Sequence, residues 1–266
     1  MCTDALGVFA VNFLPRISRP FVLVSGDSDR PVDDGILSHP EVIKILKSDL
    51  LLGWHAQNLA AEHPKLFPMP IGLDYHTMWN RPGMWGIAPI APIAQEHLML
   101  SVLGSAPYLA HRYLGAYCNW QFALDRGDRQ DCFVRVDKAA CYFEEAAMPR
   151  NSTWRRQAEF MYVLSPEGAG MDCHRTWEAL ILGCIPIVKR SPLARLFDTL
   201  PVLVVDDWSE INKDRLFEFF KTSLETQYDF SPLFLDYWKR RIKGEAVELL
   251  KPMTRMEFNS YLTRAE

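Results

Sequence analysis

The fold is decided by the stretch Leu164–Leu180, which reads LSPEGAGMDCHRTWEAL. The apolar residues 161–164 predict a buried strand, Gly168 and Gly170 predict a turn, and the residues that follow predict a helix over 172–183. Ligands of open α/β sheets bind beyond the carboxyl ends of the strands. Glycine lets the backbone approach a ligand closely, and the first turn of a helix offers N–H groups that suit a phosphate. The stretch therefore predicts an anion-binding site.

Three polar side chains of the predicted helix share one face, because His174, Arg175 and Glu178 stand at positions i, i+1 and i+4. The planar guanidinium of Arg175 suits a diphosphate, and the carboxylate of Glu178 could accept hydrogen bonds from two ribose hydroxyls. A plainer interpretation stays open: Arg175 and Glu178 could form a surface ion pair, and His174 could be structural. The glycine loop alone is a weak signal, since it is neither G-x-G-x-x-G nor a P-loop.

Apolar strands alternate with helical segments on both sides of this motif. Such alternation is typical of parallel sheets covered on both faces. We therefore expect an α/β protein with two Rossmann-like lobes whose parallel sheets face a cleft. Strands are expected at 21–25, 49–54, 67–72, 115–122, 161–164, 185–188 and 202–205, and helices at 40–46, 95–102, 153–160, 172–183 and in the tail from 232 onward.

Composition and charge exclude several classes of protein. The 266 residues carry a net charge of −4, which argues against a nucleic-acid partner, and 48% of them are hydrophobic, which argues against disorder. The six cysteines show no C-x-x-C spacing, so we interpret them as reduced thiols of an intracellular protein. No apolar run reaches the ~18 residues of a membrane span. We expect a soluble, cytoplasmic protein with no membrane span.

The donor-site motif of exostosin-like glycosyltransferases resembles this sequence over residues 165–210. The resemblance rests on Ser165 to Leu180, on Leu182-Gly183 with Ile185 to Val188, and on the later segments 200–203 and 207–210. Gln57-Asn58 and residues 70–74 fit the same pattern in the first half. The chain looks most like the compact members of algae and their giant viruses, so a viral xylosyltransferase in the host cytoplasm is the expected type.

The resemblance implies a GT-B fold, inversion at the anomeric carbon and no obligatory metal. It implies a UDP-sugar donor, UDP-xylose with β-linkage first among the candidates, and an oligosaccharide or glycoprotein glycan as acceptor. We expect residues 1–105 to form an acceptor-binding lobe and residues 106–231 a nucleotide-sugar-binding lobe, with helices of 232–266 packing back on the first; segment 82–92 is the predicted linker. The expected donor-binding residues of the motif are Ser165, Pro166, Gly168, Gly170, Asp172, His174, Arg175 and Glu178.

An inverting transfer needs a general base that takes the proton of the acceptor hydroxyl. Asp27, directly after the first strand, is our first candidate, Asp74 the second and Asp29 the third. Each could instead cap a turn or a helix. Asp27-Ser28-Asp29 also has the D-x-D form that holds Mn²⁺ or Mg²⁺ in metal-dependent transferases. Because it lies far in sequence from the donor motif, we expect no metal, with a metal-dependent transferase as the alternative.

Other residues complete the predicted site. Arg126 and Arg129 follow a strand of the second lobe and could bind the diphosphate, although an exposed loop is an equal alternative. His55 and Asn58 are candidates for the acceptor side. Two other functions stay open: a nucleotide-sugar- or glycan-binding protein without turnover, and another Rossmann-type enzyme. The missing G-x-G-x-x-G argues against the last.

Overall fold

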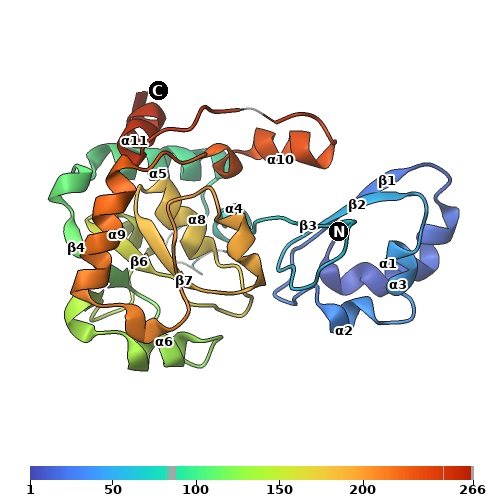
Figure 1. The fold of residues 1–266 in the computed structure, drawn as a ribbon, viewed down its shortest axis with the longest axis horizontal. Coiled ribbons are helices and arrows are strands. Elements are labelled where there is room, and N and C mark those ends of the chain that lie inside the picture. The colour runs from blue at the N-terminus through green and yellow to red at the C-terminus, as the bar shows by residue number, and fades with distance from the viewer. Residues whose placement is uncertain (82, 84–87, 248, 265–266) are drawn as a thin grey trace.

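The computed structural model describes residues 1–81, 83, 88–247 and 249–264, and it is a mixed α/β protein with two parallel sheets (Figure 1). The smaller sheet has the order β1-β2-β3, formed by β1 (Phe21–Ser25), β2 (Leu51–Ala56) and β3 (Leu66–Pro68). Both strand pairs are parallel. The expectation of parallel sheets is therefore confirmed here, although β2 lies two residues later than the segment expected at 49–54.

The larger sheet is also parallel throughout and has the order β5-β4-β6-β7-β8. The three strands expected at 161–164, 185–188 and 202–205 are observed with ends shifted by at most one residue. A fifth strand, β5, was not expected, because three residues are too few to show a periodic pattern. The strands are β4 (Tyr113–Cys118), β5 (Cys141–Phe143), β6 (Phe160–Leu164), β7 (Ile185–Lys189) and β8 (Leu203–Val205).

Helices cover both sheets, and several begin at side-chain caps expected of such termini: Asp33, Asp74 and Asn212 each accept a hydrogen bond from a first-turn N–H. Short 3-10 turns, from η1 (Thr3–Ala5) to η7 (Ser231–Leu233), lie in the connections. The α-helices are α1 (Leu6–Asn12), α2 (Asp34–Leu37), α3 (Ile43–Leu46), α4 (Tyr75–Asn80), α5 (Pro92–Ser105), α6 (Arg129–Arg135), α7 (Arg150–Gln157), α8 (His174–Ile181), α9 (Lys213–Glu225), α10 (Leu235–Ile242) and α11 (Arg255–Arg264).

The smaller lobe has a core of its own, in which α1, α2 and α3 pack on the three-stranded sheet. Trp54 of β2 is fully buried there, and its indole N–H donates to the hydroxyl of Ser25 on β1 at 2.8 Å. This hydrogen bond satisfies the indole N–H of Trp54, which would otherwise be buried without a partner. The lobe therefore holds its own apolar interior rather than sharing one with the rest of the chain.

The larger sheet is covered on both faces, as a doubly wound arrangement requires. Helices α6 and α9 pack on one face through Cys132 and Leu216, and the core there includes Tyr162 and Ile187. Helices α5, α7 and α8 pack on the other face through Met99, Trp154 and Ala179. Where the loops after two neighbouring strands lead to helices on opposite faces of the sheet, a gap opens between these loops at the carboxyl edge.

One expected boundary differs from the observed packing. Helix α5, which falls within the predicted first lobe of residues 1–105, packs with α7 and α11 on the larger lobe. In the tail expected to pack on the N-terminal lobe, α11 lies against α5 and α9 (Figure 1), whereas Arg241 of α10 adds to the effect of burial in lowering the pKa of His55 on β2. Arg255 of α11 donates to the carbonyl of Gly183 at 3.0 Å. Residues 82 and 84–87 of the expected linker lie outside the described residues.

Gly183→Ala should lower the free energy of unfolding by about 1–2 kcal/mol, because the left-handed conformation at this position disfavours any side chain. Gly183 ends α8 with φ of 74°, and an added Cβ would lie 2.5 Å from Nδ2 of Asn259. Gly104→Ala in α5 is the matched control, since an added Cβ meets nothing within 4 Å. Urea unfolding measures both; an equal effect of the two substitutions would contradict this account.

Candidate functional site

A cavity of about 660 Å³ lies at the carboxyl edge of the larger sheet. The chain passes from β4 to β5 on one side and later builds β6 on the other side of β4, so the strand order reverses between β4 and β6. Segments 119–123 after β4 and 168–175 after β6 line the cavity. Open parallel sheets bind their ligands at such a reversal point. The quoted motif therefore lies at the place in the sheet where a ligand is expected.

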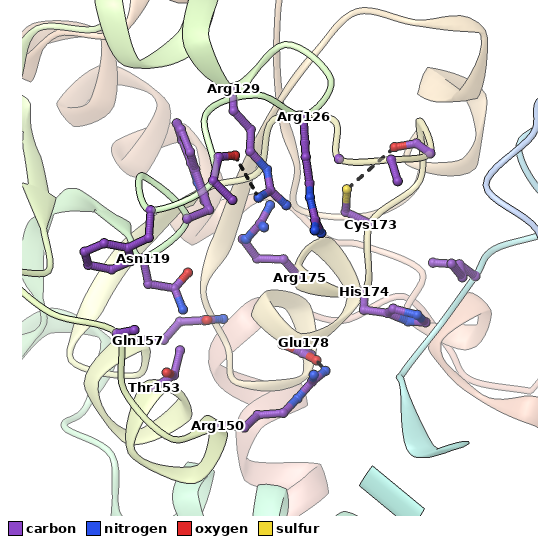
Figure 2. A pocket seen from close by; sticks show the side chains of 18 of the residues that line it. Asn119, Arg126, Arg129, Arg150, Thr153, Gln157, Cys173, His174, Arg175 and Glu178 are labelled. Carbon is purple, nitrogen blue, oxygen red and sulfur yellow. Dashed lines mark hydrogen bonds and ion pairs between the residues drawn. The ribbon is translucent and has the colours of Figure 1, made fainter. Parts of the chain in front are cut away.

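Three arginines converge on this cavity, Arg126 from the loop after β4 and Arg129 and Arg175 from the first turns of α6 and α8. Figure 2 shows the guanidinium ends of Arg126, Arg129 and Arg175 close together on one side of it. Arg129 donates to the carbonyl of Ala123 at 3.2 Å and Arg175 to that of Pro166 at 3.4 Å. Within the described part of the chain, no ion pair joins any of the three to a carboxylate. Their positive charges are therefore available to an anion.

The three arginines repel one another electrostatically. Burial, together with the charges of Arg175 and Arg126, lowers the pKa of Arg129 to about 10. Its Nε is buried and has no hydrogen-bond partner among the described residues. A group of like charges held together without neutralisation is destabilising by itself, and a bound anion would relieve it.

The loop that carries Arg126 and leads to Arg129 is fastened to the glycine loop. Asp128 accepts from the backbone N–H of Glu167 at 2.7 Å and from the indole of Trp208 at 2.8 Å. Gly127, with φ of 53°, approaches so closely that an added Cβ would lie 2.5 Å from the carbonyl oxygen of Glu167. The indole of Trp120 donates to the carbonyl of Leu164. These contacts hold in place the backbone from which the arginines extend.

Glu178 lines the cavity but is also half of a buried ion pair. Arg150, at the start of α7, contacts Oε1 of Glu178 and lies 3.6 Å from Oδ2 of Asp74. Both carboxylates and the guanidinium are buried. Burial lowers the pKa of Arg150 to about 10, which the charge of Asp74 opposes. The surface pair of Glu178 with Arg175, left open by the sequence, is not found; Glu178 pairs with a residue of another helix.

Asp172 and Asn58 join the two lobes beneath the glycine loop. Asp172 is buried, and its carboxylate accepts from the N–H of Ile71 at 2.7 Å and the indole of Trp177 at 2.8 Å. Burial raises its pKa to about 6. The side chain of Asn58 accepts from the N–H of Asp172 at 2.9 Å and donates to the carbonyl of Ser28. Both side chains thus hold backbone in place, although Asp172 also borders the cavity.

His174 lies at the N-terminus of α8, on the side of the cavity that faces the smaller lobe (Figure 2). Its Nδ1 lies 2.7 Å from the carbonyl oxygen of Gly72, in the segment that follows β3. Its ring centre lies 6.5 Å from that of His76. The first-half segment 70–74, which sequence resemblance linked to the donor motif, is therefore brought into direct contact with it.

The three candidate base carboxylates have different positions. Asp29 is exposed and lines the cavity, whereas Asp27 and Asp74 do not. Asp27 adopts φ of 53°, and its N–H donates to Oε1 of Gln57. Asp74 caps α4 through the N–H of Thr77. Burial would raise its pKa, but the hydrogen bonds of Thr77 and the charges of His174 and Arg150 lower it overall.

Four other expectations have structural outcomes. His55 is only 4% exposed and stacks on Phe67, and it does not line the cavity, so its position contradicts an acceptor contact. Asn58, also expected on the acceptor side, is buried as a link between lobes. Ser165 bonds to the hydroxyl of Thr176, and Pro166 supplies a carbonyl to Arg175; neither lines the cavity. Both therefore shape the loop rather than contact a ligand there.

Sequence reasoning missed the part of the cavity contributed by α7 and the β4 loop. Arg150 stands at the start of α7, the helix that follows β5. Because β5 was not predicted, the sequence did not indicate that Arg150 lies at the carboxyl edge of the sheet. A signal existed in the loop after β4, where polar and aromatic residues such as Asn119, Trp120 and Phe122 stand at the strand end at which ligands bind. The missed lining residues include Asn119, Phe122, Arg150, Thr153 and Gln157.

Metal and membrane features were searched in the described part of the chain. There, no group of three or more His, Cys, Asp or Glu side chains is arranged to hold a metal ion. Asp29 borders the cavity while Asp27 of the same D-x-D does not, so the two do not converge on it. No helix among the described residues has the length and apolar character needed to cross a membrane. The expectation of no obligatory metal, with a metal-dependent transferase as the alternative, stays a prediction.

Comparison with known proteins supplies no assignment. The sequence matches no family model, and a search of characterised proteins finds no match. The resemblance to exostosin-like transferases therefore stays a prediction from the motif. The features that bear on the function of the cavity are its arginines, its loops and its carboxylates.

Glu178→Leu should lower the free energy of unfolding by about 3 kcal/mol, because it removes a buried partner of Arg150. Adding Arg150→Met should recover much of that loss, since an apolar pair can replace a buried ion pair. Urea unfolding of the two single variants and the double variant measures the coupling. Simple additivity of the two single effects would show that the side chains do not interact.

Proposed function

We propose that the protein is a nucleotide-sugar-dependent glycosyltransferase. The observation that carries the proposal is the convergence of Arg126, Arg129 and Arg175, none ion-paired within the described residues, on a cavity beside a glycine loop. Each guanidinium group is planar and offers several N–H donors, a geometry that suits phosphate oxygens. A diphosphate supplies enough charge and enough oxygens to use all three.

The remaining lining residues suit the other parts of a nucleoside diphosphate. The carboxylate of Glu178 can accept from ribose hydroxyls while Arg150 holds its Oε1. Asn119 and the half-exposed Phe122 also line the cavity and offer an amide and an aromatic face, which suits a nucleobase. These features favour a nucleotide over inorganic phosphate.

A two-lobed GT-B arrangement would give each lobe a task. The larger lobe carries the arginines, and the smaller lobe reaches the cavity through Asp29, Ile71 and the segment that contacts His174. A second cavity of about 600 Å³ lies across the glycine loop and shares Asp29 and Arg126 with the first. An acceptor glycan that extends from this side would place its reacting hydroxyl in the first cavity, next to the donor. The family resemblance favours UDP-xylose among donors and an inverting transfer.

Arg175→Ala should weaken UDP binding by about 10- to 100-fold, the loss expected for one charged hydrogen bond to phosphate. Binding of uridine, which has no phosphate, should stay unchanged. Arg190→Ala is the matched control: Arg190 also follows a strand of the larger sheet, but it pairs with Asp206 and does not line the cavity. Isothermal calorimetry with UDP, UMP and uridine measures all three proteins.

Transfer itself is tested with a panel of UDP- and GDP-sugars, each with a mixture of oligosaccharide acceptors. Release of the nucleoside diphosphate that depends on the acceptor supports the proposal. Equal binding of UDP by wild type and Arg175→Ala would contradict the arginine site. Tight UDP binding without transfer from any donor would favour a nucleotide-sugar-binding protein instead.

A further inference from the structure

One imidazole borders the larger cavity within the described residues, that of His174. Its Nδ1 lies 2.7 Å from the carbonyl oxygen of Gly72. Because a carbonyl oxygen only accepts hydrogen bonds, Nδ1 carries the hydrogen and donates it. In the neutral ring Nε2 then has a free lone pair and no hydrogen. The backbone of the smaller lobe thus selects one tautomer of a side chain on the larger lobe.

The charged groups around His174 decide its protonation. Burial lowers its pKa below the usual value near 6.5, and Arg150 from α7 and His76 from α4 lower it further. The carbonyl of Gly72 and the carboxylate of Asp74 act in the opposite direction, but the overall shift is downward. The imidazole is therefore neutral at pH 7, and Nε2 accepts a hydrogen bond rather than donating one.

A neutral Nε2 suits a hydroxyl better than a phosphate. Phosphate oxygens need donors, and Nε2 of this tautomer offers none. A hydroxyl can donate to it and is then placed for proton transfer. This separates His174 from Arg175, its neighbour in sequence, which can only donate. The structure therefore gives His174 a different task from the donor-binding role that the motif suggested.

The carboxylates suggested by the sequence fit the role of base less well. Asp27 does not line the cavity, and Asp74 is buried while capping α4 and pairing with Arg150. Asp29 does line the cavity, but its side chain is exposed, whereas His174 is held in place by the backbone of Gly72. Asp29 is therefore the one carboxylate of the three that the test has to distinguish from His174.

We propose that His174 is the general base that takes the proton of the acceptor hydroxyl, an inference that rests on the proposed glycosyl transfer. The hydroxyl hydrogen moves to Nε2 as the acceptor oxygen forms its bond to the anomeric carbon. The bond from that carbon to the diphosphate breaks, and its electron pair leaves with the nucleoside diphosphate. The imidazolium then returns the proton to solvent.

His174→Asn tests the role while preserving the structural contact. The amide nitrogen of asparagine is separated from Cα by as many bonds as Nδ1 of histidine, so it can still donate to Gly72. No group remains to take a proton. We expect kcat to fall by about 10²- to 10⁴-fold, the usual contribution of a general base, with KM and UDP affinity changed less than about threefold. His97→Asn, an exposed histidine of α5 outside the cavity, should retain wild-type kcat.

Two outcomes would overturn the proposal. If His174→Asn transfers sugar at the wild-type rate while Asp29→Asn loses activity, Asp29 is the base. If His174→Asn instead weakens UDP binding as strongly as it lowers kcat, His174 is a donor ligand. Neither outcome contradicts the proposed function, which fails separately if the wild-type protein neither binds a nucleoside diphosphate nor transfers sugar.

The pH dependence and the tautomer give independent readouts. A base must be unprotonated to act, so kcat should rise with pH through the lowered pKa of His174 and level off above it; Asp29→Asn should keep that profile. Nitrogen-15 NMR of the imidazoles should show the His174 ring with its hydrogen on Nδ1 at neutral pH, without any substrate. A hydrogen on Nε2 would contradict the proposal directly.

Discussion

The carboxylate of Asp172 is the contact on which the arrangement of this molecule depends. It accepts one hydrogen bond from Ile71, in the segment after β3, and one from Trp177 on α8, so a single buried group ties the smaller lobe to the helix behind the cavity. Asn58 adds a bond to the N–H of Asp172 itself. Buried polar groups that are fully paired specify one packing geometry, because losing a partner leaves an unsatisfied atom. The lobes therefore meet in a defined way around the glycine loop.

That fixed geometry keeps the three arginines of the cavity close together, although none of them pairs with a carboxylate among the described residues. A flexible loop would let Arg126 and Arg129 separate, but Asp128 and Gly127 fasten their loop to the backbone of Glu167. Electrostatic sites act most strongly when their charges are positioned before the ligand arrives. His174 follows the same principle, since the carbonyl of Gly72 orients its ring in advance. The backbone thus positions these side chains before a ligand binds.

Much of this could be predicted from the sequence, because apolar runs and glycines report directly on strands and turns. Strand β1 and the convergence of Gly168, Arg175 and Glu178 on one cavity are examples. Long-range partners could not be predicted in this way. Nothing in the local pattern indicates that Arg150 pairs with Glu178, or that the carboxylate of Asp172 accepts a hydrogen bond from the N–H of Ile71. The three-residue strand β5 is also too short to show periodicity, and its omission hid the α7 side of the site.

The end of the chain has a consequence for how the protein is made. Arg255 of α11 donates to the carbonyl of Gly183, and Phe258 stacks on Phe230. The larger lobe is therefore complete only after α11 has been synthesised, whereas the smaller lobe is synthesised earlier and has its own interior. During translation the smaller lobe can fold while the face of the larger lobe that α11 covers is still exposed.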